Sequence, residues 1–172
     1  TEHAMYFGMV GNNGKLCANR AMNEADLLIM IGARVADRAV NQPDIITTNK
    51  VLVHIDVDSA EIGKNALPSI PIVGDAMCIF QDFMEQEITC EDHKEWIDTL
   101  NEYKKRIFRK RNPNPNYVDP AEFIRKLSLK MQKDGVYVED VGQNQIWSCA
   151  YHIVREGRFM TSGGMGTMGY SI

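Results

Sequence analysis

The chain has 172 residues, of which 44% are hydrophobic, 24% charged and 8% aromatic. This composition is that of a globular protein rather than a disordered or collagen-like one, and the length fits one domain or two small or incomplete ones. The formal net charge of -4 provides no overall positive field for nucleic acid or an anionic membrane, so we expect neither partner.

The apolar runs, the N-terminal residues and the cysteines indicate where in the cell the protein is located. The longest apolar run, residues 27–31, is far shorter than the roughly 20 residues of a membrane-spanning helix. Residues 1–10 lack the basic start and long apolar stretch of a secretory signal, and the chain opens abruptly, as a segment of a longer protein would. The cysteines form no C-x-x-C pair, so we expect reduced thiols in a cytoplasmic protein.

Strand and helix patterns alternate in the first half. Apolar runs at 27–31 and 51–57 are bounded by Gly, Asp or Asn and predict strands. Short strands that are apolar on both sides are typical of a parallel sheet. Residues 75–87 carry one apolar helical stripe, and Asp75 is a natural N-cap. This alternation predicts an α/β fold with right-handed crossovers.

The middle of the chain predicts a linker. A helical pattern over 90–111 ends in a basic cluster, which we interpret as a solvated helix end rather than a nucleic-acid site. Residues 112–116 contain two prolines and cannot continue a helix. We therefore expect one unit at 1–88, a helical linker at 89–117 and a second unit at 118–172.

The second unit has an α/β pattern of its own. Asp119 and Pro120 predict a capped helix start. A strand at 135–138, a turn, a short helix from Gln143 and a strand at 158–160 follow, and this unit is not completed within the chain.

Two segments of the second unit follow predicted strands. Residues 163–169 contain G-x-G-x-x-G, whose backbone can approach a diphosphate closely, or can simply form a tight loop. Residues 140–145 place helix amides where phosphate can bind, although Asp140 could instead cap those amides. Two such loops at neighbouring strand ends are how an open α/β sheet binds a cofactor.

Loops at strand ends in the first half offer a second candidate crevice. Arg34 and Arg38 could hold an anionic ligand there, with surface ion pairs to Asp37 or Asp44 as the alternative. His54 is expected to be a satisfied sheet histidine rather than a catalytic residue or metal ligand. The sequence contains no nucleophile-elbow, Walker or HExxH motif, which leaves hydrolase chemistry without support.

Five strings of residues carry a family resemblance: 18–28, 31–38, 54–65, 140–147 and 161–170. The first three resemble the central domain, and the last two the opening of the cofactor-binding domain, of the thiamine-diphosphate-dependent acetolactate synthase (acetohydroxyacid synthase) large-subunit family. The implied fold is part of a Rossmann-like parallel sheet followed by the first part of a second α/β, thiamine-diphosphate-binding domain. The chain departs from the family pattern at 11–14, where Gly-Asn-Asn-Gly replaces Gly-Met-His-Gly, and at Asn144, which replaces a histidine.

The resemblance implies two cofactor sites. Gly142, Gln143 and Asn144 would contact the diphosphate of thiamine diphosphate, and Gly166 and Met168 would hold its aminopyrimidine. A structural FAD would map onto Asn12, Asn13, Gly14, Gly32, Ala33, Arg34, Asp37, Arg38, Asp56, Val57, Gly74 and Asp75. The resemblance assigns no catalytic residue and no metal ligand to this chain, since the activating glutamate would lie upstream and the Mg²⁺-binding Gly-Asp-Gly motif downstream.

The resemblance also implies an activity. The parent protein would decarboxylate pyruvate and condense it with a second 2-oxo acid to give 2-acetolactate for branched-chain amino-acid biosynthesis. We expect a homo-oligomer, with a regulatory subunit left open, and an inactive isolated segment with exposed apolar edges. Two alternatives remain, namely another thiamine-diphosphate-dependent carboligase or decarboxylase, and a non-catalytic nucleotide-binding module built on residues 163–169.

Overall fold

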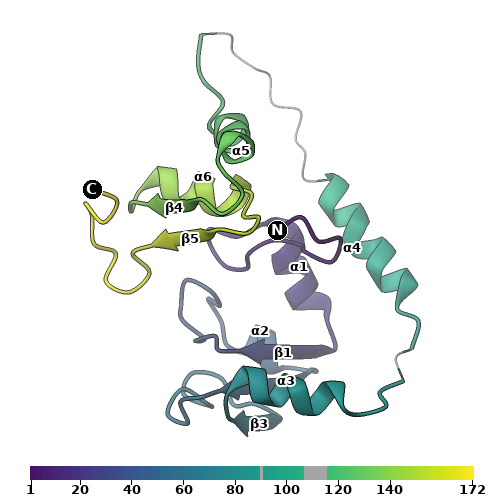
Figure 1. The fold of residues 1–172 in the computed structure, drawn as a ribbon. Helices are drawn as coiled ribbons and strands as arrows, with labels where there is room; N and C mark the ends of the chain where they lie inside the picture. The colour runs from purple at the N-terminus through teal and green to yellow at the C-terminus, as the bar shows by residue number, and fades with distance from the viewer. Residues whose placement is uncertain (90, 107–115) are drawn as a thin grey trace.

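The computed structural model describes residues 1–89, 91–106 and 116–172. Within these residues the helices and strands are, in chain order, α1 (Leu16–Glu24), β1 (Leu27–Ile31), α2 (Asp44–Thr47), β2 (Val51–Asp56), β3 (Ile70–Val73), α3 (Ala76–Met84), α4 (Lys94–Arg106), α5 (Pro120–Lys130), β4 (Val136–Glu139), α6 (Gln143–Tyr151) and β5 (Arg158–Thr161). Two parallel sheets form, one with the order β1-β2-β3 and one pairing β4 with β5 (Figure 1). The predicted α/β class is therefore confirmed.

The core of the first unit lies on one face of the β1-β2-β3 sheet. Leu52, in the central strand β2, is 0% exposed. It belongs to a buried cluster drawn from α2 and from the loops that follow β1 and β2, and its other members are Val35, Val40, Ile46 and Ala66. Burying these apolar side chains is the main favourable contribution to the stability of this unit.

The opposite face of the same sheet is exposed along β1, although Ile55 of β2, which shares that face, is only 2% exposed. Leu27, Ile29 and Ile31 alternate onto this face of β1 and are between 39% and 56% exposed. Val51 and Ile70 of the neighbouring strands are exposed as well. Parallel sheets normally carry helices on both faces. The prediction of strands buried on both sides is therefore wrong for β1, because the buried cluster around Leu52 packs only against the other face of this strand.

The ammonium group of Lys50 caps the C-terminus of α1. Lys50 Nζ donates to the carbonyl oxygens of Met22 (3.1 Å) and Ala25 (2.8 Å), and also to that of Asn23. The last carbonyls of a helix lack intrahelical partners and carry partial negative charge, so a cation here is doubly favourable. Lys50 precedes β2 directly and thereby joins α1 to the sheet.

We expect Lys50→Met to lower the free energy of unfolding by about 1–2 kcal/mol, because methionine keeps much of the apolar stem but leaves three carbonyls without their donor. Urea denaturation followed by circular dichroism measures the change. Lys126→Met is the control, since the ion pair of Lys126 with Glu122 at 2.9 Å is exposed and its loss should change stability little. Equal effects of the two substitutions would contradict the capping role.

The predicted capped helix start at Asp119 and Pro120 is confirmed. Asp119 caps α5 by accepting hydrogen bonds from the amides of Ala121 (2.9 Å) and Glu122 (3.3 Å), and Pro120 is the first helical residue. Strand β4 starts at Val136 rather than at residue 135, because the Gly135 amide donates to the Gln132 carbonyl at 3.1 Å and is still part of a turn.

Helices α3 and α4 are shorter in the structure than the sequence patterns predicted. Asp75 is confirmed as the cap of α3, but that helix ends at Met84, and α4 begins at Lys94. Residues 90 and 107–115, which hold much of the predicted basic cluster and the prolines of the predicted linker, lie outside the described residues. Cys17, Cys78 and Cys149 are free thiols, as expected.

His54 differs from its prediction. It is 1% exposed in β2, and neither ring nitrogen has a hydrogen-bond partner among the described residues. The expectation of a satisfied histidine is therefore wrong, since strand alternation turns the ring into an apolar interior that offers no acceptor or donor. Separately, none of the helices in the described ranges is long and apolar enough to cross a membrane.

Candidate functional site

Parallel pairing of β4 and β5 brings the two predicted cofactor loops together. Glu139 lies beside Thr161 at the carboxyl ends of the two strands, so the loops that leave these strands start at the same edge. Gly142 is the N-cap residue of α6, has φ of 147° and makes no side-chain cap. The first amides of α6 therefore lack the protein partner that a capping side chain would supply.

The side chains after Gly142 anchor the start of α6. Asn144 Nδ2 donates back to Glu139 Oε1 (2.5 Å) and to the Asp140 carbonyl (3.0 Å). Gln145 Nε2 donates to Thr161 Oγ1 at 2.7 Å and so connects α6 to the end of β5. These bonds fix the orientation of an exposed helix N-terminus, where backbone amides and the helix dipole favour an anion.

The glycine-rich loop opposite is open. A Cβ atom placed on Gly163, Gly164 or Gly166 would meet nothing within 4 Å. Met168 is 77% exposed, although an apolar thioether is costly to leave in water. Inside the loop, the Thr167 amide donates to Ser162 Oγ at 2.9 Å. The loop can therefore admit a flat organic group beside Met168 without a clash from its own backbone.

Asp140 connects the two loops and does not cap α6. Its two carboxylate oxygens each accept from the Gly169 amide at 2.9 Å, and Oδ1 also accepts from the Val141 amide at 2.8 Å. The Gly169 amide, followed by that of Val141, lowers the pKa of Asp140 below its usual value. The predicted alternative, in which Asp140 caps the helix amides, is therefore wrong because the carboxylate faces the other loop.

Tyr137, Ser148 and His152 form a partly buried cluster between β4 and α6. The Tyr137 hydroxyl and Ser148 Oγ are 2.9 Å apart and link β4 to α6. The His152 ring lies 4.2 Å from the Tyr137 ring, and burial lowers the pKa of His152, which favours the neutral ring. These contacts hold α6 on the sheet and keep the loops above them in place.

Strand-end loops of the first unit also meet at one edge. The Gly32 amide donates to the Ile55 carbonyl and the Gly74 amide to the Asp56 carbonyl, each at 2.9 Å. The Asn12 amide donates to the Arg38 carbonyl at 2.9 Å, so residues 11–14 join the same edge. The structure thus brings together the residues that the sequence assigned to one crevice.

A side chain that the sequence analysis did not single out as a site residue holds the 11–14 loop. Asn19 Oδ1 accepts from the Gly11 amide at 2.7 Å, and Asn19 Nδ2 donates to the Gly11 carbonyl at 3.0 Å. Gly11 has φ of 100°, and a Cβ there would lie 2.4 Å from the Arg38 carbonyl oxygen. Only glycine fits this close approach.

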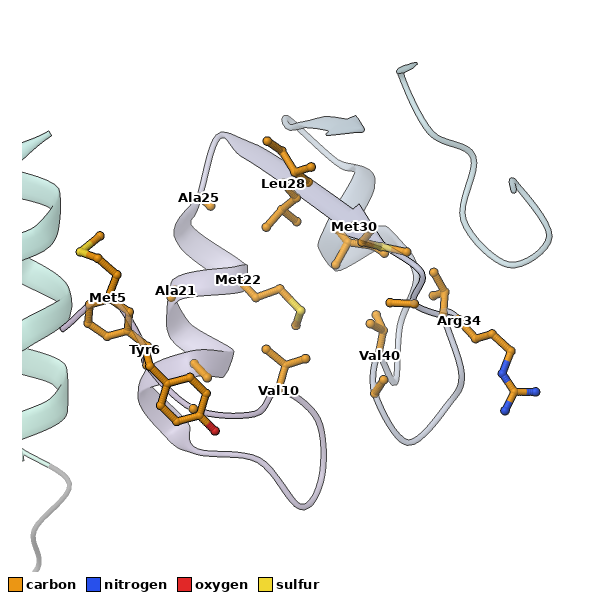
Figure 2. A pocket seen from close by; sticks show the side chains of 18 of the residues that line it. Met5, Tyr6, Val10, Ala21, Met22, Ala25, Leu28, Met30, Arg34 and Val40 are labelled. Carbon is orange, nitrogen blue, oxygen red and sulfur yellow. The ribbon is translucent and has the colours of Figure 1, made fainter. Parts of the chain in front are cut away.

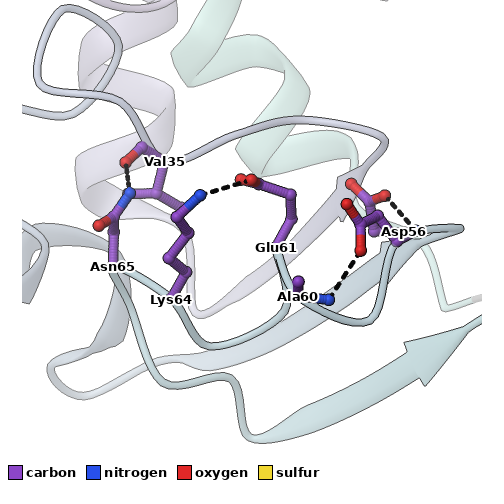
Figure 3. A network of polar contacts seen from close by, with 7 residues as sticks. Val35, Asp56, Ala60, Glu61, Lys64 and Asn65 are labelled. Atoms are coloured by element: carbon purple, nitrogen blue, oxygen red, sulfur yellow. Dashed lines mark hydrogen bonds and ion pairs between the residues drawn. The ribbon is translucent and has the colours of Figure 1, made fainter.

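Much of the polar capacity at this edge is used within the chain. Asp56 Oδ1 accepts from the Asp58 amide at 2.9 Å, and Asn65 Nδ2 donates to the Val35 carbonyl at 2.7 Å (Figure 3). Asp75 is occupied as the α3 cap. Arg34 and Arg38 form no ion pair with any described residue, so the predicted pairs to Asp37 or Asp44 are absent there. A dinucleotide would therefore depend on these two arginines.

A cavity of about 500 Å³ lies beside the first sheet. Figure 2 shows apolar side chains such as Met22 and Val40 around it, whereas the guanidinium of Arg34 points away from them. Trp96 of α4 also lines this cavity. The walls of this cavity are therefore largely apolar, and the charged end of Arg34 does not face into it.

Comparison with known proteins defines the class. Residues 1–86 match the family model described as the thiamine pyrophosphate enzyme, central domain. This is half of the chain, and it covers the β1-β2-β3 sheet and α3. The chain therefore belongs to the thiamine pyrophosphate enzyme central-domain family.

Relatives extend the similarity across both units. The chain is 36% identical to the acetolactate synthase large subunit of Lactococcus lactis over 172 residues, which is 99% of this chain and 30% of that protein. It is 36% identical to a probable acetolactate synthase large subunit of Methanococcus aeolicus (98% of this chain, 31% of that protein). It is 35% identical to the Corynebacterium glutamicum large subunit (99% and 28%). The chain thus spans about 30% of the length of these relatives.

Proposed function

We propose that the chain is part of an acetolactate synthase large subunit, which joins two 2-oxo acids with the help of thiamine diphosphate. The observation that carries the proposal is the juxtaposition of residues 142–144 and 166–168 at one sheet edge, connected through Asp140 and Gly169. Similarity to such subunits over almost the whole chain supports it.

The second unit fits the cofactor. The uncapped N-terminus of α6 at Gly142 would receive the diphosphate through the amides of Gln143 and Asn144. The open loop at Gly166 and the exposed Met168 would hold the aminopyrimidine ring. When bound, thiamine diphosphate stabilises negative charge on the substrate carbon, and the protein supplies orientation and electrostatics. No residue of this chain is assigned to the chemical step, and Mg²⁺ ligands would lie outside it.

We extend the proposal to domain organisation and partners. Residues 1–88 would belong to the central domain, 89–117 to a linker and 118–172 to the cofactor-binding domain, in agreement with the family match over 1–86. FAD would use Arg34 and Arg38, which have no described ion-pair partner. The parent would be a cytoplasmic homo-oligomer of branched-chain amino-acid biosynthesis, able to take a regulatory subunit, and the exposed face of β1 is available for association.

The complete protein that contains this chain should release acetolactate from pyruvate when thiamine diphosphate and Mg²⁺ are present, whereas the 172-residue chain alone should not. The reason is that the residues positioned here bind and orient but do not complete the electrostatic environment of the reaction. Acetolactate formation, measured for both proteins at equal concentration, checks this.

Two outcomes would contradict the proposal. A complete protein that consumes another 2-oxo acid but never pyruvate would indicate a different thiamine-diphosphate enzyme. Thermal stabilisation of the chain by NAD, but not by thiamine diphosphate with Mg²⁺, would indicate a nucleotide-binding module instead, because a ligand stabilises the protein whose folded state it binds.

A further inference from the structure

The glycine-rich loop between β5 and the end of the chain has few attachments. Its first residues are fixed by the sheet and by the bond from Gln145 to Thr161 at 2.7 Å. Between them and Gly169, a Cβ atom placed on Gly163, Gly164 or Gly166 would meet no atom of the described residues within 4 Å. A segment with so many glycines has high conformational entropy unless something fixes its far end.

The Gly169 amide provides that far attachment. It donates to both oxygens of Asp140 at 2.9 Å, and a hydrogen bond to an ionised carboxylate is stronger than one between neutral groups. Gly169 has φ of 84°, a conformation that aims its amide at Asp140 and that other residues adopt only with strain. Asp140 itself follows β4 directly, and its own orientation is fixed by the Val141 amide at 2.8 Å.

From this geometry we infer that Asp140 is a positioning residue, which fixes the glycine-rich loop against the β4–α6 loop and so sets the spacing between the diphosphate-binding and aminopyrimidine-binding halves of the site. The inference rests on the proposed cofactor for its functional part. The lowered pKa of Asp140 agrees with it, because the amides of Gly169 and Val141 stabilise the ionised carboxylate.

The negative charge of Asp140 could also act against cofactor binding, by repelling the diphosphate. If Asp140 acted mainly through its charge, it would repel the anion, and removing the charge would tighten binding. If it acts by fixing the loop, removing its acceptor oxygens weakens binding, since the cofactor must then order the loop itself. The two roles therefore predict changes of opposite sign.

The test uses the complete protein that contains this chain, with Asp140→Ala and Asp140→Asn. Hydrogen exchange of the backbone around Gly169, followed by mass spectrometry without cofactor, should become at least tenfold faster in Asp140→Ala. The thiamine diphosphate concentration for half-saturation, followed with Mg²⁺ by isothermal titration calorimetry, should rise at least tenfold. Asp140→Asn keeps one acceptor oxygen and should give intermediate values for both.

Asp119→Ala is the matched control. Asp119 also accepts two backbone amides in the second unit, but at the start of α5, so its removal should lower stability while leaving Gly169 exchange and cofactor affinity unchanged. Unchanged Gly169 exchange in Asp140→Ala, or tighter cofactor binding by Asp140→Asn, would overturn the inference. If the unsubstituted complete protein binds no thiamine diphosphate, the proposed function loses its support, and the Gly169 exchange rates alone decide whether Asp140 fixes the loop.

Discussion

Leu52→Ala should lower the free energy of unfolding by about 2–5 kcal/mol, the range measured when a buried leucine is truncated in a packed core. Leu52 is 0% exposed and lies in the central strand, so its neighbours cannot collapse into the space without moving β1 or β3. Because whole domains are stable by only about 5–15 kcal/mol, this single change should remove a large part of the stability.

Urea denaturation followed by the fluorescence of Trp96, in a Trp147→Phe background, measures this loss, since Trp96 lines the cavity beside the first sheet. Leu67→Ala is the matched control, because the same atoms are removed from a side chain that is 80% exposed. A similar loss in both variants would mean that burial on one sheet face is not what stabilises the first unit.

The fold class could be predicted because its signals are local. The apolar runs that became β1 and β2, and the caps at Asp75 and Asp119, need only neighbouring residues to act, and all four are present. The burial of β1 could not be predicted in the same way. Whether Leu27 or Leu28 is covered depends on which helices pack on each face, and hydrophobicity alone does not distinguish the two.

The candidate site shows the same division. Glycines such as Gly142 and Gly166 could be found from the sequence, because the residue type itself indicates backbone conformational freedom. Both adopt positive φ angles in the structure. The contacts of Lys50 and Asp140 were not found. Each joins segments more than twenty residues apart, and a lysine or aspartate at a strand end has no pattern that names its distant partner.

His54 shows a further limit. A histidine in an apolar strand usually finds a hydrogen-bond partner, and the sequence offered no reason to expect otherwise. The ring is nevertheless buried without a partner among the described residues. Such a result depends on the three-dimensional neighbours of one side chain, which strand periodicity does not specify.

Gly157→Ala should destabilise the second unit by about 2–4 kcal/mol, because added atoms in a tight backbone contact force the strands apart. A Cβ at Gly157 would lie 2.0 Å from the Gly135 carbonyl oxygen and 2.8 Å from the Asp134 carbonyl carbon, which are backbone atoms that cannot rotate away. The Gly157 amide also donates to the Lys133 carbonyl at 2.9 Å just before β5 begins, so a shift here displaces the start of β5 relative to β4.

The consequence for function follows from the position of the loops. Both proposed cofactor loops leave the carboxyl ends of β4 and β5, so a displaced strand should weaken thiamine diphosphate binding as well as stability. In single-tryptophan variants, in which Trp96 or Trp147 is replaced by phenylalanine, Trp147 fluorescence during urea denaturation should report the loss, while Trp96 fluorescence should report a nearly unchanged first unit. Gly163→Ala is the control, since a Cβ there meets nothing within 4 Å. If Gly163→Ala were as damaging as Gly157→Ala, the general loss of a glycine, rather than the close contact with Gly135, would explain the effect.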